Sequence, residues 1–172
     1  RYVNVKSLAE TTTKVVTQRP QSPVKMERPL GVDAPTVRII DGHFDAAVSK
    51  LDGLPKNVVV CALADAFEKH ADVLADRMRA LQLDDPMAAL NTAFLNDGVF
   101  VYVPKGTIVE KPVQLLFENT ATAGSMSTPR VVVVVEEGAQ FTLYEHHSGH
   151  GPGYVANHVS HWSVARGAIA KH

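Results

Sequence analysis

The spacing of apolar residues changes once along the chain, close to residue 96. Before that point a mostly apolar stripe recurs at intervals of three or four, through Leu63, Phe67, His70, Leu74, Met78 and Leu81. This spacing predicts an amphipathic helix that is interrupted near His70, with the imidazole packed on the apolar face rather than bound to a ligand. After that point, short runs of β-branched and aromatic residues predict strands.

The stretch from Asp85 to Pro104 joins these two patterns. Asp85 suits a helix N-cap and Pro86 suits the first helical position, so we expect a second helix there. Turn residues follow at 96–98, and Val99–Val103 has the composition of a strand that ends at Pro104. The preceding Asp84-Asp85 pair is interpreted as a helix boundary rather than an acid/base couple.

Strands follow one another closely in the second half of the chain. We predict them at Val99–Val103, Val113–Phe117, Val131–Val135, Gln140–Glu145, Val155–Val164 and from Ile169 onward. Glycine turns recur at Gly106, Gly138 and Gly167, at intervals of 32 and 29 residues. A repeat of strands near thirty residues favours a solenoid of stacked coils, although a sandwich or a barrel also fits strands at this spacing.

The first third of the chain is harder to assign to secondary structure. Residues 1–35 are rich in Thr, Pro and Lys, and we expect a solvated, loop-rich segment there. Thr36–Phe44 predicts a hairpin around Asp41-Gly42, and Asn57–Leu63 predicts a buried strand that contains Cys61. The predicted organisation is therefore a loop-rich segment at 1–35, a small α/β lobe at 36–95 and a β region at 96–172.

Several segments carry a resemblance to a known family. Leu90–Phe117, LNTAFLNDGVFVYVPKGTIVEKPVQLLF, resembles the SufB/SufD proteins of iron–sulfur cluster assembly, in which a helix, an Asp-Gly turn and a strand ending Val-Pro-x-Gly open the core. Thr128-Pro129-Arg130, Glu136–Gly149 and the stretch from Gly153 to His172 are similar to later parts of that core. The absence of a cysteine-rich stretch favours the SufD branch.

The resemblance implies both a fold and a function. The fold would be mostly β, with the opening rungs of a right-handed parallel β-helix preceded by a small α/β lobe. The protein would be a non-catalytic scaffold subunit of a cytoplasmic SufBCD-type complex, with SufB-like and SufC-like partners. No tightly bound cofactor is expected, since the complex as a whole handles the iron–sulfur cluster, and the region that contacts SufC would lie outside this chain.

Composition narrows the functional classes further. The net charge of −1 over 172 residues gives no overall field that would attract nucleic acid or an anionic membrane. The apolar runs, such as Val131–Val135, are far shorter than the roughly 18–20 residues of a membrane-spanning helix. Cys61 is the only cysteine, which rules out a disulfide within the chain and fits a reducing compartment, and its expected role is a small core residue.

Because the chain begins at Arg1 and ends within a strand-like pattern, we expect a fragment of a longer protein whose last strand offers an edge for self-association.

Histidine is concentrated near the end of the chain, and it carries the candidate chemistry. Six of the eight histidines lie between His146 and His172, next to Glu145. The candidate metal ligands are His146, His147 and His150, in an HHxxH pattern, and an HxxH pattern adds His158 and His161. Residues one or three apart on a strand, however, point to opposite faces. We therefore expect exposed histidines at the strand ends more than a metal site.

Two further functions remain open at this point. Clustered histidines would suit a metal-dependent enzyme with a cupin-like β-barrel, and a solenoid without metal would suit a protein-interaction module. A nucleophile elbow and a nucleotide-binding P-loop are both absent from the sequence. The resemblance to the SufB/SufD proteins implies that the chain is not an enzyme.

Overall fold

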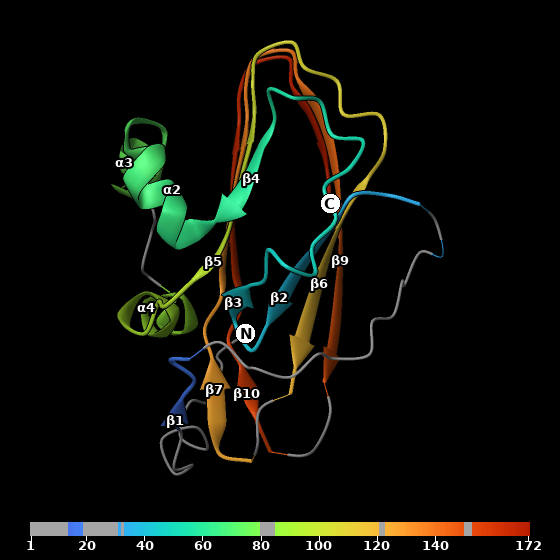
Figure 1. Ribbon diagram of the computed structural model, residues 1–172. Helices are drawn as coiled ribbons and strands as arrows, with labels where there is room; N and C mark the ends of the chain where they lie inside the picture. Colours follow the sequence, from blue (N-terminus) through green and yellow to red (C-terminus); the bar gives the residue numbers. More distant parts are fainter. Residues whose placement is uncertain (1–13, 19–30, 32, 80–84, 121–122, 150–152) are drawn as a thin grey trace.

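The computed structural model describes residues 14–18, 31, 33–79, 85–120, 123–149 and 153–172 (Figure 1). These residues form a mostly β molecule with three helices: α2 (Leu63–Lys69), α3 (Ala71–Arg79) and α4 (Pro86–Ala93). The strands lie in three sheets, and strand pairing within them is parallel except at two places. At this level the fold agrees with the predicted class.

The first sheet is the smallest and has the order β1-β7-β10, from Lys14–Val15, Ser125–Ser127 and Val155–Ala156. The second sheet has the order β11-β8-β5-β4, from Val159–Val164, Arg130–Val135, Gly98–Val103 and Val59–Ala62. The third sheet has the order β12-β9-β6-β2-β3, from Ile169–Lys171, Gln140–Gly149, Val113–Asn119, Thr36–Ile40 and His43–Phe44.

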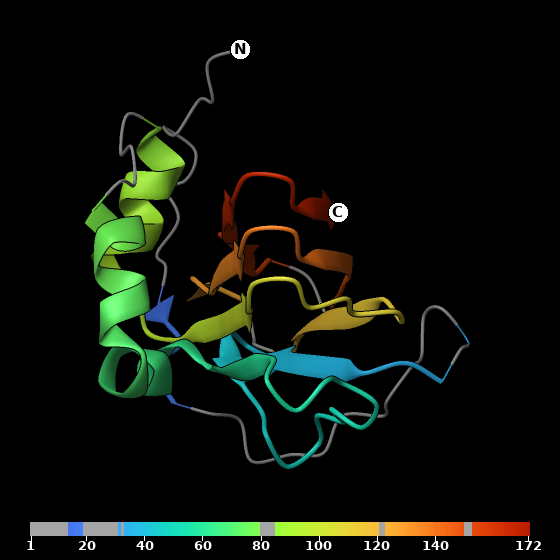
Figure 2. The ribbon, with the colours of Figure 1, turned by 90° about the horizontal axis from the view of Figure 1, so that it is seen from above.

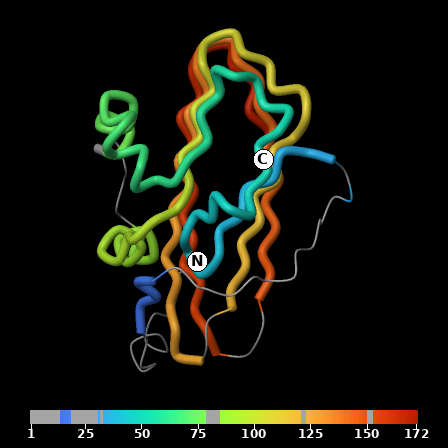
Figure 3. The backbone as a smooth tube through the Cα atoms, in the orientation of Figure 1, coloured from blue at the N-terminus to red at the C-terminus, as the bar shows by residue number. Residues whose placement is uncertain are grey.

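From β5 onward, successive strands belong to the second, third and first sheets in that order, and this order of sheets then repeats. In the second sheet, Gly98 pairs with Arg130, which pairs in turn with Val159, so successive strands are 32 and 29 residues apart (98 to 130, then 130 to 159). These are the intervals expected from the glycine turns. Figure 2 shows successive passes of the chain stacked next to one another, and in the orientation of Figure 3 the same passes overlap.

The glycine turns themselves stack. Gly106, Gly138 and Gly167 have φ of 68°, 67° and 70°, a backbone conformation that glycine adopts without the steric cost of a Cβ. The Gly106 amide donates to the Glu137 carbonyl at 2.9 Å, and the Gly138 amide donates to the Arg166 carbonyl at 3.3 Å. The turns therefore set the length of each repeat.

The central core lies between the second and third sheets. It is built from alternate residues of their strands: Val37, Ile39, Phe44, Val99, Val101, Val103, Val109, Val113, Leu115, Phe117, Val131, Val133, Val135, Ala139, Phe141 and Leu143. A second cluster packs the opposite face of the second sheet against α2 and α3, through Leu63, Ala66, Leu74, Phe100, Val132 and Val134. The valine run at 131–135 is thus covered on both faces, as its lack of polar residues predicts.

Several local predictions are confirmed by the backbone. The helical stripe breaks at His70, which separates α2 from α3. Asp85 caps α4, and its Oδ1 accepts from the amides of Met87 at 2.7 Å and Ala88 at 3.0 Å. The β2–β3 hairpin turns at residues 41–42, which both have positive φ.

Other local predictions are wrong or incomplete. Lys14–Val15, inside the predicted loop, forms β1 because it pairs with β7, a partner more than 100 residues away that local composition does not reveal. The predicted strand at Val155–Val164 is divided into β10 and β11, because the chain passes from the first sheet to the second around Asn157 and His158. The Asn57–Leu63 strand is shorter, since α2 begins at Leu63.

Helix α4 is held on the second sheet by buried polar side chains. The Asn91 amide donates to the carbonyls of Pro129 at 3.0 Å and Asn157 at 2.8 Å, which belong to successive passes of the chain. The buried Arg130 guanidinium donates to the Thr92 hydroxyl at 2.7 Å.

None of the helices among the described residues is both long enough and apolar enough to cross a membrane.

Candidate functional site

Strand β9 carries polar residues on the same face that builds the central core. Phe141 and Leu143 pack into the core, and Glu145 and His147 follow at alternate positions of the same strand. The neighbouring strand β6 places Leu115 beside Glu145 and Phe117 beside His147. One repeat further along the chain, therefore, a carboxylate and an imidazole replace two apolar side chains.

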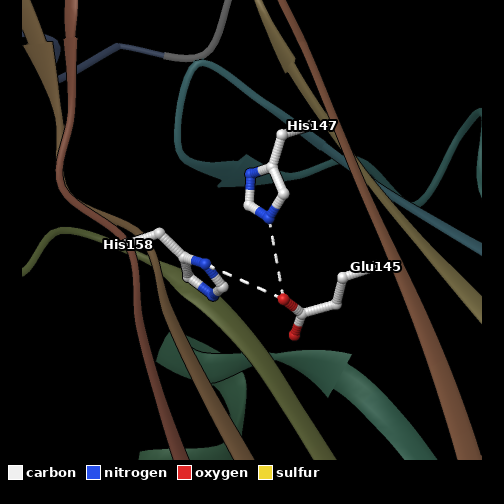
Figure 4. Close-up of side chains that lie close together, drawn as sticks. All are labelled: Glu145, His147 and His158. Atoms are coloured by element: carbon white, nitrogen blue, oxygen red, sulfur yellow. Dashed lines mark ion pairs between the residues drawn. The ribbon is translucent and has the colours of Figure 1, made fainter. Parts of the chain in front are cut away.

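His158 completes a cluster with these two residues (Figure 4). It comes from the segment between β10 and β11, and its Nδ1 lies 3.9 Å from Glu145 Oε2. His147 Nε2 lies 3.6 Å from the same carboxylate oxygen. The three ligand atoms lie within 4.8 Å of one another, which makes this group a candidate metal centre.

The second carboxylate oxygen of Glu145 faces other partners. The Ser160 hydroxyl donates to Oε1 at 3.2 Å, and His172 Nε2 lies 3.3 Å from it. The same hydroxyl lies 3.2 Å from Nε2 of His158. The Glu145 carboxylate is nearly buried, with 10% of its side chain exposed, so these contacts are screened little by solvent.

Aromatic rings lie against the imidazoles that surround Glu145. Phe117 stacks on His147 with a ring separation of 4.5 Å and an interplanar angle of 2°, and it lies 4.3 Å from the ring of His158. Trp162 lies 5.2 Å from the ring of His172. A cavity of about 10 Å³ lies against Phe117, His147 and His158, which is room for about one water-sized species.

The charge states of the cluster follow from burial and from the neighbouring groups. Burial opposes ionisation of Glu145, but His147, His158, His172 and the Ser160 hydroxyl outweigh it and lower the pKa of the carboxyl. Burial, opposed by Glu145 and reinforced by His147 and His172, lowers the pKa of His158 to about 4. At neutral pH, therefore, the cluster holds an ionised carboxylate beside a neutral imidazole.

Of the three histidines that the sequence proposes as metal ligands, the structure brings only His147 into the cluster. His146 points to the opposite face of β9, where it pairs with Leu116, and His150 lies outside the described residues. His161 likewise lies on the outer face of β11, beside Val132.

The sequence places Glu145, His147 and His158 among the candidate residues, but it does not predict that these three meet. The signal was present in the alternation that follows Phe141 and Leu143, which places Glu145 and His147 on one face. It was also present in the repeat near thirty residues, which brings the start of β11 across from the end of β9. Neither signal was used, because the strand was predicted to end at Glu145, whereas β9 continues to Gly149.

Cys61 does not offer a second reactive site. It is half-buried on β4, and burial together with Asp65 and Asp97 raises the pKa of its thiol, against a smaller opposing effect of Lys69. A raised pKa keeps the thiol protonated and weakly nucleophilic at neutral pH. This agrees with the packing role expected from its sequence.

Comparison with known proteins identifies the family. The model of the SufBD protein N-terminal region matches residues 1–115, about two thirds of the chain. The chain belongs to the SufBD family. The candidate metal centre at Glu145, His147 and His158 lies beyond the residues that the family model matches.

Individual SufBD relatives come from both branches of the family. The chain is 32% identical over 96 residues to the iron–sulfur cluster assembly SufBD family protein ABCI9 of Arabidopsis thaliana, covering 54% of this chain and 20% of that protein. It is 42% identical over 83 residues to Bacillus subtilis SufB, covering 46% and 17%, and 27% identical over 95 residues to Bacillus subtilis SufD, covering 54% and 22%. The aligned part thus spans about a fifth of the length of these relatives, and it matches SufB and SufD alike.

Proposed function

We propose that this chain is part of a non-catalytic subunit of a SufBCD-type complex that assembles iron–sulfur clusters. The observation that carries the proposal is the family match over residues 1–115, together with relatives named as iron–sulfur cluster assembly proteins. The partners would be a second SufBD-type subunit and a SufC-like ATPase, in the cytoplasm, and the cluster would be the cargo of the complex. The SufD branch stays a prediction from sequence, because SufB and SufD relatives both match.

The fold that we propose for this subunit is a right-handed parallel β-helix, of which these residues are the opening rungs. The proposal is supported by the repeated visiting order of the three sheets and by the parallel register of β5, β8 and β11. A scaffold of this type needs no catalytic group, since stacked rungs give a rigid surface on which partners assemble.

A cupin-like enzyme does not fit the strand arrangement. Cupin barrels are jelly rolls of antiparallel strands, whereas the described strands pair in parallel except at β2–β3 and β4–β5. An interaction module outside iron–sulfur assembly remains the second candidate, and the exposed Val164 and Ile169 on the edge strands β11 and β12 are the surface it would use.

Affinity purification of the full-length protein from its native host under anaerobic conditions tests the proposal. We expect an ATPase subunit and a second SufBD-type subunit to co-purify, and depletion of the protein to lower the activity of iron–sulfur enzymes while enzymes without clusters keep theirs. The isolated subunit should not hydrolyse ATP. Recovery of the protein without either partner, or unchanged iron–sulfur enzymes after depletion, would contradict the proposal.

A further inference from the structure

We propose that Glu145, His147 and His158 bind one divalent transition-metal ion between β9 and the start of β11. This goes beyond the scaffold role, for which no resident metal is needed. Two imidazoles and one carboxylate form a ligand set that suits zinc or ferrous iron and leaves further coordination positions open. The ligand atoms would be Glu145 Oε2, His147 Nε2 and His158 Nδ1.

The distances are close to those that a bound ion requires. Bonds of about 2.0–2.2 Å in a tetrahedral site place neighbouring ligand atoms about 3.4 Å apart. The carboxylate oxygen lies 3.6 Å from the His147 nitrogen and 3.9 Å from the His158 nitrogen. Both separations are too long for a direct hydrogen bond and slightly longer than the spacing of ligand atoms in a tetrahedral site.

The hydroxyl of Ser160 supplies an independent argument from hydrogen bonding. A hydroxyl has a single proton, and with that proton assigned to the bond to Glu145 Oε1 at 3.2 Å, the Ser160 oxygen accepts from His158 Nε2, also at 3.2 Å. The His158 proton therefore sits on Nε2, and Nδ1 directs a lone pair toward Glu145 Oε2. Two acceptors that face each other in a nearly buried place are stabilised by a cation between them.

The surrounding residues also fit the second shell of a metal site. Ser160 and His172 hold the carboxylate oxygen that faces away from the imidazoles, and Ser160 fixes the tautomer of His158. Phe117 packs on both imidazole rings and restricts their rotation. The adjoining cavity of about 10 Å³ is lined by His147 and His158 but not by Glu145, and it has room for about one water-sized species beside the two imidazoles.

The test is metal binding by the full-length protein after removal of metal with a chelator. Isothermal titration with Zn²⁺, and absorption spectra with Co²⁺ as a probe, would report one site per chain. We expect E145Q, H147A and H158A each to weaken this site by about 100-fold or more, and S160A by about 10- to 100-fold, the range typical of second-shell losses. Fluorescence of Trp162, which lies beside the ring of His172, should change on Co²⁺ binding, and the difference between the wild type and Trp162→Phe isolates its signal in the full-length protein.

Matched controls come from the same two strands. H146A and H161A remove imidazoles from the outer faces of β9 and β11, and the affinity should stay within about twofold of the wild type. Thermal unfolding without metal shows which variants are folded, and the isosteric E145Q keeps the test valid if an alanine variant is not.

Each other outcome overturns the inference. These outcomes are no binding to the wild type, equal binding to E145Q and the wild type, or equal losses in H146A and H147A. The last would indicate adventitious binding by surface histidines. All three leave the proposed scaffold function untouched, because the co-purification experiment does not depend on this site.

Discussion

Leu115 and Phe117 of β6 pair in register with Glu145 and His147 of β9, and Val131 of β8 pairs with Ser160 of β11. We call β6 and β8 the lower level and β9 and β11 the upper level. The backbone arrangement is the same at both levels, with parallel pairing and alternate side chains directed toward the core. At these positions the lower level has apolar side chains, whereas the upper level has a carboxylate among imidazoles and a hydroxyl. The comparison shows that the strand scaffold fixes where side chains meet, and that their chemistry is free to vary from one repeat to the next.

The largest expected effect comes from exchanging the residues at one register pair. Leu115→Glu places a carboxylate at a site that is 1% exposed, among apolar core residues and beside the Glu145 carboxylate, and it should lower the free energy of unfolding by about 3–5 kcal/mol. Glu145→Leu, measured without metal at neutral pH, should lower it by less, because the imidazole of His158 is neutral and is not left as an unpaired buried charge. Urea denaturation measures both, and equal losses would show that the two levels do not differ.

A second exchange tests the same contrast at a smaller scale. Val131→Ser buries a hydroxyl among the apolar core residues and should cost about 1–3 kcal/mol. Ser160→Val should cost less, since Glu145 keeps contacts with three imidazoles after the hydroxyl is lost. A Ser160→Val variant that is the less stable of the two would indicate that the polar level depends on this hydrogen bond.

The smallest expected effect concerns His161 on the outer face of β11, which serves as a reference for the buried residues of the upper level. Burial and the nearby Arg130 lower the pKa of His161, so the folded protein favours its neutral form. Its contribution to stability is complete above the unfolded pKa of about 6.5 and is lost as the pH falls through the lower folded value. Denaturation at pH 7.5 and pH 5 should show that His161→Gln loses less stability on acidification than the wild type, and an equal loss in both would assign the pH dependence to other groups.

Local chemistry accounts for the elements that could be predicted. The Asp85-Pro86 start of α4, the break at His70 and the glycine turns are confirmed because each depends on a few neighbouring residues. The short strands β1 and β7 were missed because two or three residues carry too little pattern, and only pairing between distant segments makes them strands. The division of the chain at residues 35 and 95 stays a prediction. Strands β2 and β4, which belong to the predicted lobe at 36–95, extend sheets that are built mainly from strands of the predicted β region at 96–172.

The sequence by itself determined that the chain is mostly β after residue 96, repeats near every thirty residues and resembles the SufBD family. It could do so because turn residues, strand composition and family motifs are properties of short stretches of chain. Only the tertiary structure decided which histidines meet. His147 and His158 are brought to Glu145 by the register between repeats and by the extension of β9 to Gly149, whereas the adjacent His146 points away because neighbours on a strand face opposite sides.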